Sequence, residues 1–162
     1  MNKHLKLVRE FNETLSFPQA AHGADVHLSD MDIVMHQALL MEEGSTVLKA
    51  IKAGEMVQIL AGLVNLAYTA LGAIAMRGTD VTDQPVTWRH DGFVVSIMRI
   101  LSEKIHNCTS GSTDDYSEVY CLCVHLTRSF INADFDKALQ MIHEGKLSKP
   151  VKAPDLSECL YE

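Results

Sequence analysis

The stretch that decides the fold runs from Met56 to Met76 and reads MVQILAGLVNLAYTALGAIAM. It is apolar at most positions and, as a helix, long enough to cross a bilayer. It also carries Gln58, Gly62 and Asn65, and it lies between amphipathic segments. These features favour a buried helix at the centre of a helical bundle over a membrane span.

On both sides of this stretch, apolar residues recur at helical spacing. Ser29 is a candidate N-cap, and Gly54 and Gly78 are candidate C-terminal stops. No run alternates with the period of a strand. The pattern predicts helices at about 3–15, 29–52, 55–76, 92–106, 114–131 and 134–144. We therefore expect one all-α domain over residues 1–162, built as a bundle of four to five helices.

Composition narrows the range of partners and locations. The chain has 162 residues, 47% of them hydrophobic, and a formal net charge of −7. This acidic balance argues against a nucleic-acid partner but leaves room for a small phosphorylated ligand. We expect a cytoplasmic protein without a membrane partner, because residues 1–10 do not resemble a signal peptide. The cysteines lack CxxC spacing and are expected to be reduced: Cys108, Cys121, Cys123 and Cys159.

Four stretches, taken in order, resemble the all-α nucleoside triphosphate pyrophosphohydrolases, the superfamily of MazG-like proteins, phosphoribosyl-ATP pyrophosphohydrolase and dimeric dUTPases. Leu7–Glu13 with Phe17-Pro18 is similar to the family's opening motif, and Leu39–Glu43 to its LLxEE segment. Asn65–Gly72 resembles DLLYVVLG. Residues 134–149 resemble a segment that ends in VHrsNmSK. Residues 82–120 have no counterpart in short family members and look like an inserted or extended helical segment.

The resemblance implies a MazG-like bundle that cleaves a nucleotide between its α and β phosphates with Mg²⁺. The family holds the metal with ExxE on one helix and ExxD on the next, and carboxylate oxygens are the ligands that hard cations prefer. In this chain Glu43 stands at the first position, whereas Thr46, Gly62 and Asn65 stand at the other three. Mg²⁺ binding is therefore expected to be weak or absent.

The candidate metal ligands are Glu42, Glu43 and Asn65, since an asparagine can offer a carbonyl oxygen. Two interpretations of the glutamates compete: they remain metal ligands, or they are a solvated pair on a helix surface.

The candidate phosphate ligands are His143, Lys146 and Lys149, which align with the family's phosphate-contacting segment. Cations are also favoured near helix C-termini without any ligand, so this alternative stays open.

Three functions remain open. The preferred hypothesis is a nucleotide-binding protein of this type that is weakly active or inactive. The alternatives are an active pyrophosphohydrolase with a rearranged metal site and a purely structural or interacting helical dimer. A homodimer or higher homo-oligomer is expected, both from the family and because one domain of this size can hardly bury every face of the 55–76 helix.

Overall fold

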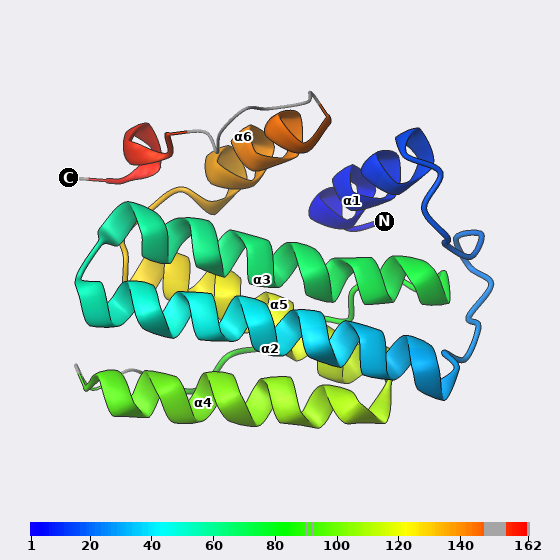
Figure 1. Cartoon of the computed structure of the whole chain (residues 1–162), viewed down its shortest axis with the longest axis horizontal. Coiled ribbons are helices and arrows are strands. Elements are labelled where there is room, and N and C mark those ends of the chain that lie inside the picture. The colour runs from blue at the N-terminus through cyan, green and yellow to red at the C-terminus, as the bar shows by residue number, and fades with distance from the viewer. Residues whose placement is uncertain (90, 92, 148–154, 162) are drawn as a thin grey trace.

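The computed structural model of the chain is helical and describes residues 1–89, 91, 93–147 and 155–161 (Figure 1). Within these residues there is no strand, and the one isolated β-bridge joins Ala133 to Leu160. The all-α prediction is confirmed. The elements are α1 (Lys3–Thr14), α2 (Asp30–Ala53), α3 (Met56–Arg77), α4 (Val94–Asn107), η1 (Cys108–Ser110), α5 (Thr113–Ser129), α6 (Phe135–Leu147) and η2 (Ser157–Cys159).

Helices α2 and α3 form an antiparallel hairpin (Figure 1). The Ser29 side chain caps α2 by accepting a hydrogen bond from the Asp32 N–H, and Gly54 ends α2 in the left-handed region at φ 70°. A Cβ on Gly62 would lie 2.9 Å from Val47 Cγ2 and 3.3 Å from Val47 Cα. Gly62 therefore lets the two helices approach closely, and any side chain there would push against the backbone of α2.

The segment 82–120 completes the bundle. It supplies a loop, α4, η1 and the first turns of α5. Helix α5 packs against α3, and α4 packs against both α2 and α5, so α2, α3, α5 and α4 close a four-helix bundle (Figure 1).

Helices α1 and α6 lie over α3 and run parallel to each other (Figure 1). The chain between α1 and α2 covers the C-terminus of α3, where the carbonyls of Met76, Arg77 and Gly78 accept hydrogen bonds from that segment. Gly78 has φ 75°, and a Cβ there would lie 2.4 Å from the Ala21 carbonyl oxygen. Only glycine satisfies this close approach.

The argument that α3 needs a second chain to cover it is wrong. Helices α1, α2, α5 and α6 of the same chain cover it, and Leu60, Leu66 and Ile74 are fully buried. Within the described residues α3 is the one helix apolar and long enough to cross a membrane, and 72% of its most apolar window is buried in the fold. Such burial is what a core helix shows. Apart from Met56 at the start of α3, the large exposed apolar side chains lie elsewhere, many of them on α2.

Candidate functional site

The predicted metal ligands do not form a carboxylate cluster. Glu42 is exposed on α2, Glu43 is half-buried one turn before Val47, and Asn65 is half-buried on α3. The Thr46 hydroxyl donates a hydrogen bond back to the Glu42 carbonyl oxygen at 3.1 Å. In the part of the chain that the structure describes, no three His, Cys, Asp or Glu side chains come together as a metal site. The residues present therefore fit a Mg²⁺ ion poorly.

Two of the predicted phosphate ligands, His143 and Lys146, do converge with residues from distant helices. The Lys146 ammonium lies 4.9 Å from the centre of the Tyr68 ring and 5.9 Å from that of Phe11. The Phe11 and Tyr68 rings meet edge to face, with centroids 5.7 Å apart. Helices α1, α3 and α6 thus hold the ammonium over two aromatic faces, an arrangement that favours a cation.

His143 is buried with one nitrogen unpaired. Its side chain is 2% exposed, and its Nδ1 lies 3.3 Å from the Tyr68 hydroxyl oxygen. Its Nε2 is buried without a hydrogen-bond partner among the described residues. The nearest carboxylate oxygen, Glu10 Oε2, is 3.9 Å away, which is too far for a hydrogen bond. We assign the Nε2 tautomer, in which the Tyr68 hydroxyl donates to Nδ1 and Nε2–H remains an unused donor.

Glu43 and Lys146 carry opposite charges, and each partly offsets the effect of burial on the pKa of the other. Burial raises the pKa of Glu43, while the positive charge of Lys146 acts to lower it. Lys146 is exposed as a residue, but the partial desolvation of its ammonium against the two rings lowers its pKa, while Glu43 acts to raise it. Burial also lowers the pKa of His143, so the ring is neutral at pH 7. The site therefore combines one ammonium, which Glu43 attracts, with one buried and unpaired imidazole nitrogen.

We name the site formed by Glu10, Phe11, Tyr68, His143 and Lys146 the open site, because one of its buried donors is unpaired. Glu43 borders it from α2. The sequence pointed to Glu43, His143 and Lys146, but it did not identify Glu10 as part of the site. Glu10 stands in the stretch that resembles the family opening, and nothing local distinguishes it from other exposed glutamates. Lys149 lies outside the described residues.

No protein family, curated protein or solved structure matches this chain. The resemblance to the all-α pyrophosphohydrolases therefore stays a prediction, and the function has to be argued from the side chains themselves.

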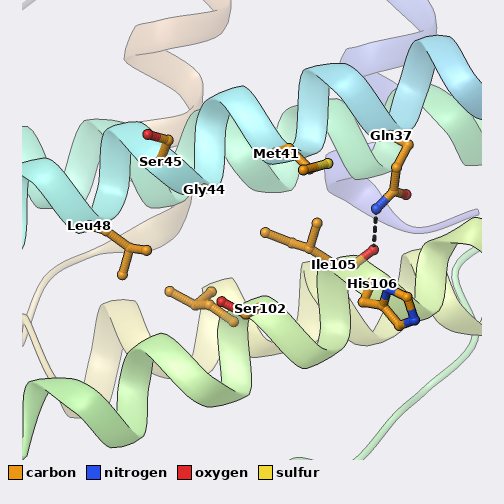
Figure 2. Close-up of a pocket in the computed structure, with 9 residues that line it drawn as sticks. Gln37, Met41, Gly44, Ser45, Leu48, Ser102, Ile105 and His106 are labelled. Atoms are coloured by element: carbon orange, nitrogen blue, oxygen red, sulfur yellow. Dashed lines mark hydrogen bonds between the residues drawn. The ribbon is translucent and has the colours of Figure 1, made fainter.

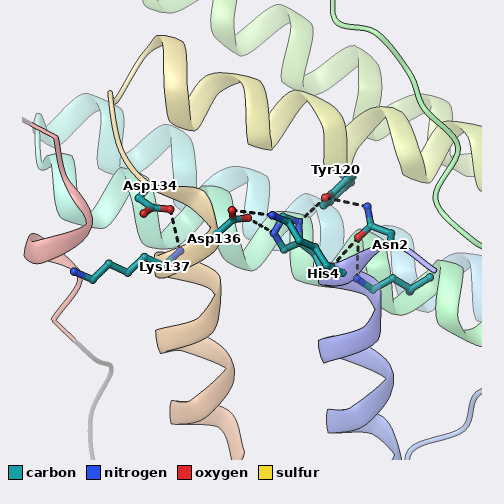
Figure 3. Close-up of polar contacts among 8 residues, drawn as sticks. Asn2, His4, Tyr120, Asp134, Asp136 and Lys137 are labelled. Carbon is teal, nitrogen blue, oxygen red and sulfur yellow. Dashed lines mark hydrogen bonds and ion pairs between the residues drawn. The ribbon is translucent and has the colours of Figure 1, made fainter.

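A second buried histidine, His4 of α1, lies against α6, and both of its ring nitrogens have hydrogen-bond partners (Figure 3). His4 Nδ1 is 2.5 Å from the Tyr120 hydroxyl, and His4 Nε2 is 2.5 Å from Asp136 Oδ1. Asn2 donates to Tyr120 from its side chain, and Lys3 forms an ion pair with Asp136 at 2.9 Å. We name His4, Tyr120 and Asp136 the closed triad. Sequence analysis missed it, because a lone histidine near the start of a helix carries no recognisable spacing.

Proposed function

We propose that this chain binds a phosphorylated small molecule, a nucleotide in the first instance, at the open site and hydrolyses it slowly or not at all. The carrying observation is that Tyr68 contacts both the Lys146 ammonium and the ring of His143, whose Nε2 is unpaired. A phosphate oxygen accepts hydrogen bonds from both kinds of donor, and a charged acceptor strengthens each bond. A buried donor left without a partner is costly, which supports a site that is completed by a ligand.

Weak catalysis is expected because most of the carboxylates that would hold the metal are absent. Pyrophosphate release needs the charge on the leaving group to be neutralised, which Mg²⁺ does in enzymes of this class. Here the four positions that should converge hold Glu43, Thr46, Gly62 and Asn65, and Gly62 is packed against Val47. A single carboxylate at these positions holds Mg²⁺ weakly, because charge count tunes affinity.

The test is a calorimetric titration with ATP, first in EDTA and then in Mg²⁺, combined with an assay for released pyrophosphate. We expect saturable binding in EDTA, at most a small gain with Mg²⁺, and slow or no release. Lys146→Met should weaken binding at least tenfold, since a hydrogen bond to a charged group contributes about 1.5–3 kcal/mol.

The matched control is Lys49→Met, which removes an exposed lysine from α2 and should leave ATP affinity unchanged. Equal losses in both variants would show that only overall charge matters and would contradict the site. Tight Mg²⁺-dependent binding with rapid pyrophosphate release would favour the active enzyme instead.

We also propose that the chain forms a homodimer through α2. Its outer face carries large exposed apolar side chains, with exposed fractions of 73% for Met31, 57% for Val34 and 60% for Met41. Asp30 begins this helix and Lys52 lies in its last turn. An antiparallel pair of α2 helices from two copies would cover the apolar face and place opposite charges at each end. Light scattering at micromolar concentration tests this: a dimer that Met31→Glu converts to a monomer supports it, and a monomeric native chain contradicts it.

A further inference from the structure

The open site offers a ligand charges of both signs. The pocket of about 280 Å³ between α2 and α4 has no Asp, Glu, Lys or Arg among the described residues that line it (Figure 2). In the open site, by contrast, the Glu10 carboxylate lies 3.9 Å from His143 Nε2. The Lys146 ammonium lies over the Tyr68 ring, whose hydroxyl contacts the other nitrogen of the same imidazole. A ligand of this site therefore meets a carboxylate as well as an ammonium.

The carboxylate of Glu10 is open to solvent, yet its charge acts on the interior of the site. The Glu10 side chain is 59% exposed. Burial raises the pKa of Tyr68 and lowers that of His143, and the charge of Glu10 acts to raise both. Glu10 Oε2 is too far from His143 for a hydrogen bond, so this contact leaves the carboxylate free to accept one from a ligand.

A carboxylate at the edge of an anion site is unfavourable unless the ligand also carries hydrogen-bond donors. Glu10 repels a bare phosphate group, whereas a hydroxyl close to the phosphate would donate a hydrogen bond to it. A hydrogen bond to an ionised acceptor is roughly twice as strong as one between neutral groups. The charges of the open site therefore favour a phosphorylated ligand with nearby hydroxyls over phosphate alone.

The spacing of the two charged groups along α6 indicates where these hydroxyls belong. His143 and Lys146 are three residues apart on this helix, which places their Cβ atoms about 5–6 Å from each other. Glu10 lies against the first of them, and the second holds the ammonium. A nucleotide carries its 2′ and 3′ hydroxyls one sugar ring away from its phosphates, a separation of this order.

We infer that Glu10 determines the ligand specificity of the open site by accepting hydrogen bonds from the sugar hydroxyls of a nucleotide whose phosphates lie at Lys146. This inference rests on the function proposed above and adds the class of ligand to it. The ligand is a ribonucleotide, because an analogue without these hydroxyls meets only the repulsion of the carboxylate.

The experiment compares ATP with 2′,3′-dideoxy-ATP, which has the same base and phosphates and lacks both hydroxyls. Calorimetric titrations of the full native chain in EDTA measure the two affinities. We expect ATP to bind about tenfold more tightly, because it alone donates to the carboxylate. Glu10→Gln should weaken the binding of ATP and tighten that of the dideoxy analogue about threefold, since the repulsion is removed, so that the two probes bind alike.

The matched control is Glu103→Gln, which makes the same change of net charge at an exposed residue of α4, on the other side of the bundle (Figure 1). It should leave the preference for ATP unchanged. Equal affinity for the two probes in the native chain, or a preference that survives in Glu10→Gln, would overturn the inference. If the probes bind alike and Lys146→Met weakens both, the proposed anion site stands and only the role of Glu10 is wrong. If neither probe binds, the proposed function is wrong as well.

Discussion

Helices α1 and α6 each carry one buried histidine, and each ring lies near a tyrosine hydroxyl and a carboxylate of the opposite helix. The two sites differ in whether both of these contacts are short enough to be hydrogen bonds. In the closed triad, His4 of α1 meets Asp136 of α6 and a tyrosine of the bundle, with both ring nitrogens at 2.5 Å from their partners. In the open site, His143 of α6 meets Glu10 of α1 and a tyrosine of α3, at 3.9 Å and 3.3 Å. Both rings are buried, with exposed fractions of 5% for His4 and 2% for His143. The first set of contacts is complete, and the second leaves Nε2 unpaired.

The difference separates a structural polar cluster from a candidate binding site. The neutral His4 ring donates to the Asp136 carboxylate and accepts from the Tyr120 hydroxyl, so every member has its partner. Burial alone would raise the pKa of Asp136, but hydrogen bonds from Lys3 and His4 hold it below its usual value. His143 has the same chemistry, but its second partner is too distant. The unpaired nitrogen of His143 supports the proposed binding site, whereas the completed contacts of His4 call for no ligand.

The largest expected effect is on stability. His4→Leu should lower the free energy of unfolding by about 2–4 kcal/mol, because it leaves the Tyr120 O–H without an acceptor and removes one hydrogen bond to Asp136. His143→Leu should cost less, about 1 kcal/mol, since it deprives the Tyr68 hydroxyl of one long hydrogen bond but also removes an unpaired buried nitrogen. Urea unfolding followed by circular dichroism measures both. The exposed His27 provides the control, and His27→Leu should stay within about 0.5 kcal/mol of the native chain. Equal losses of stability in His4→Leu and His143→Leu would contradict the distinction between the closed triad and the open site.

The second effect is the dependence of stability on pH. Burial, chiefly, lowers the pKa of His4 in the fold in spite of the opposing effect of Asp136, and burial lowers the pKa of His143 as well. In the unfolded chain both titrate near about 6.5. The unfolded state therefore binds more protons below this pH, and stability should fall as pH drops from about 7 towards the lowered values of the folded protein. Urea unfolding between pH 7.5 and 5.5 measures the slope, which should become shallower in His143→Leu. A native chain whose stability is flat or rises over this range would contradict the burial argument.

The smallest effect concerns Glu43 and decides between its two interpretations. If Glu43 only competes with the ligand for Lys146, Glu43→Gln should tighten ATP binding in EDTA by roughly threefold, a gain of about 0.7 kcal/mol. If Glu43 is a metal ligand, the same change should weaken binding in Mg²⁺ and leave binding in EDTA unaltered. We predict the first outcome. The exposed Glu42 supplies the control, because Glu42→Gln should alter neither affinity by more than a small factor.

Local signals predicted the bundle well, because caps and periodicity act over a few residues. Ser29, Gly54 and Gly78 mark the ends of α2 and α3 where the sequence placed them. The prediction that α3 lacks cover failed, because periodicity within one helix does not reveal how many neighbours pack on it. Helix α5 and the two helices above α3 supply that cover.

The polar sites are harder to predict, because their members lie far apart in the chain. His4 and Asp136 are separated by 132 positions, and Tyr68 and His143 by 75. The sequence indicated His143 and Lys146 only through the order of stretches that resemble the motifs of a family. It did not indicate that Glu10 stops short of His143, since a gap of 3.9 Å depends on how α1 and α6 pack.

The central claim is that the open site binds a phosphorylated ligand and that the closed triad does not. Long-range ¹H–¹⁵N NMR of the histidine rings, recorded while ATP is added in EDTA, tests it most directly. We predict that the Nε2 signal of His143 moves saturably as the nitrogen gains an acceptor, and that both nitrogens of His4 stay in place. A titration in which His143 does not respond, or in which His4 and His143 move together, would contradict this account.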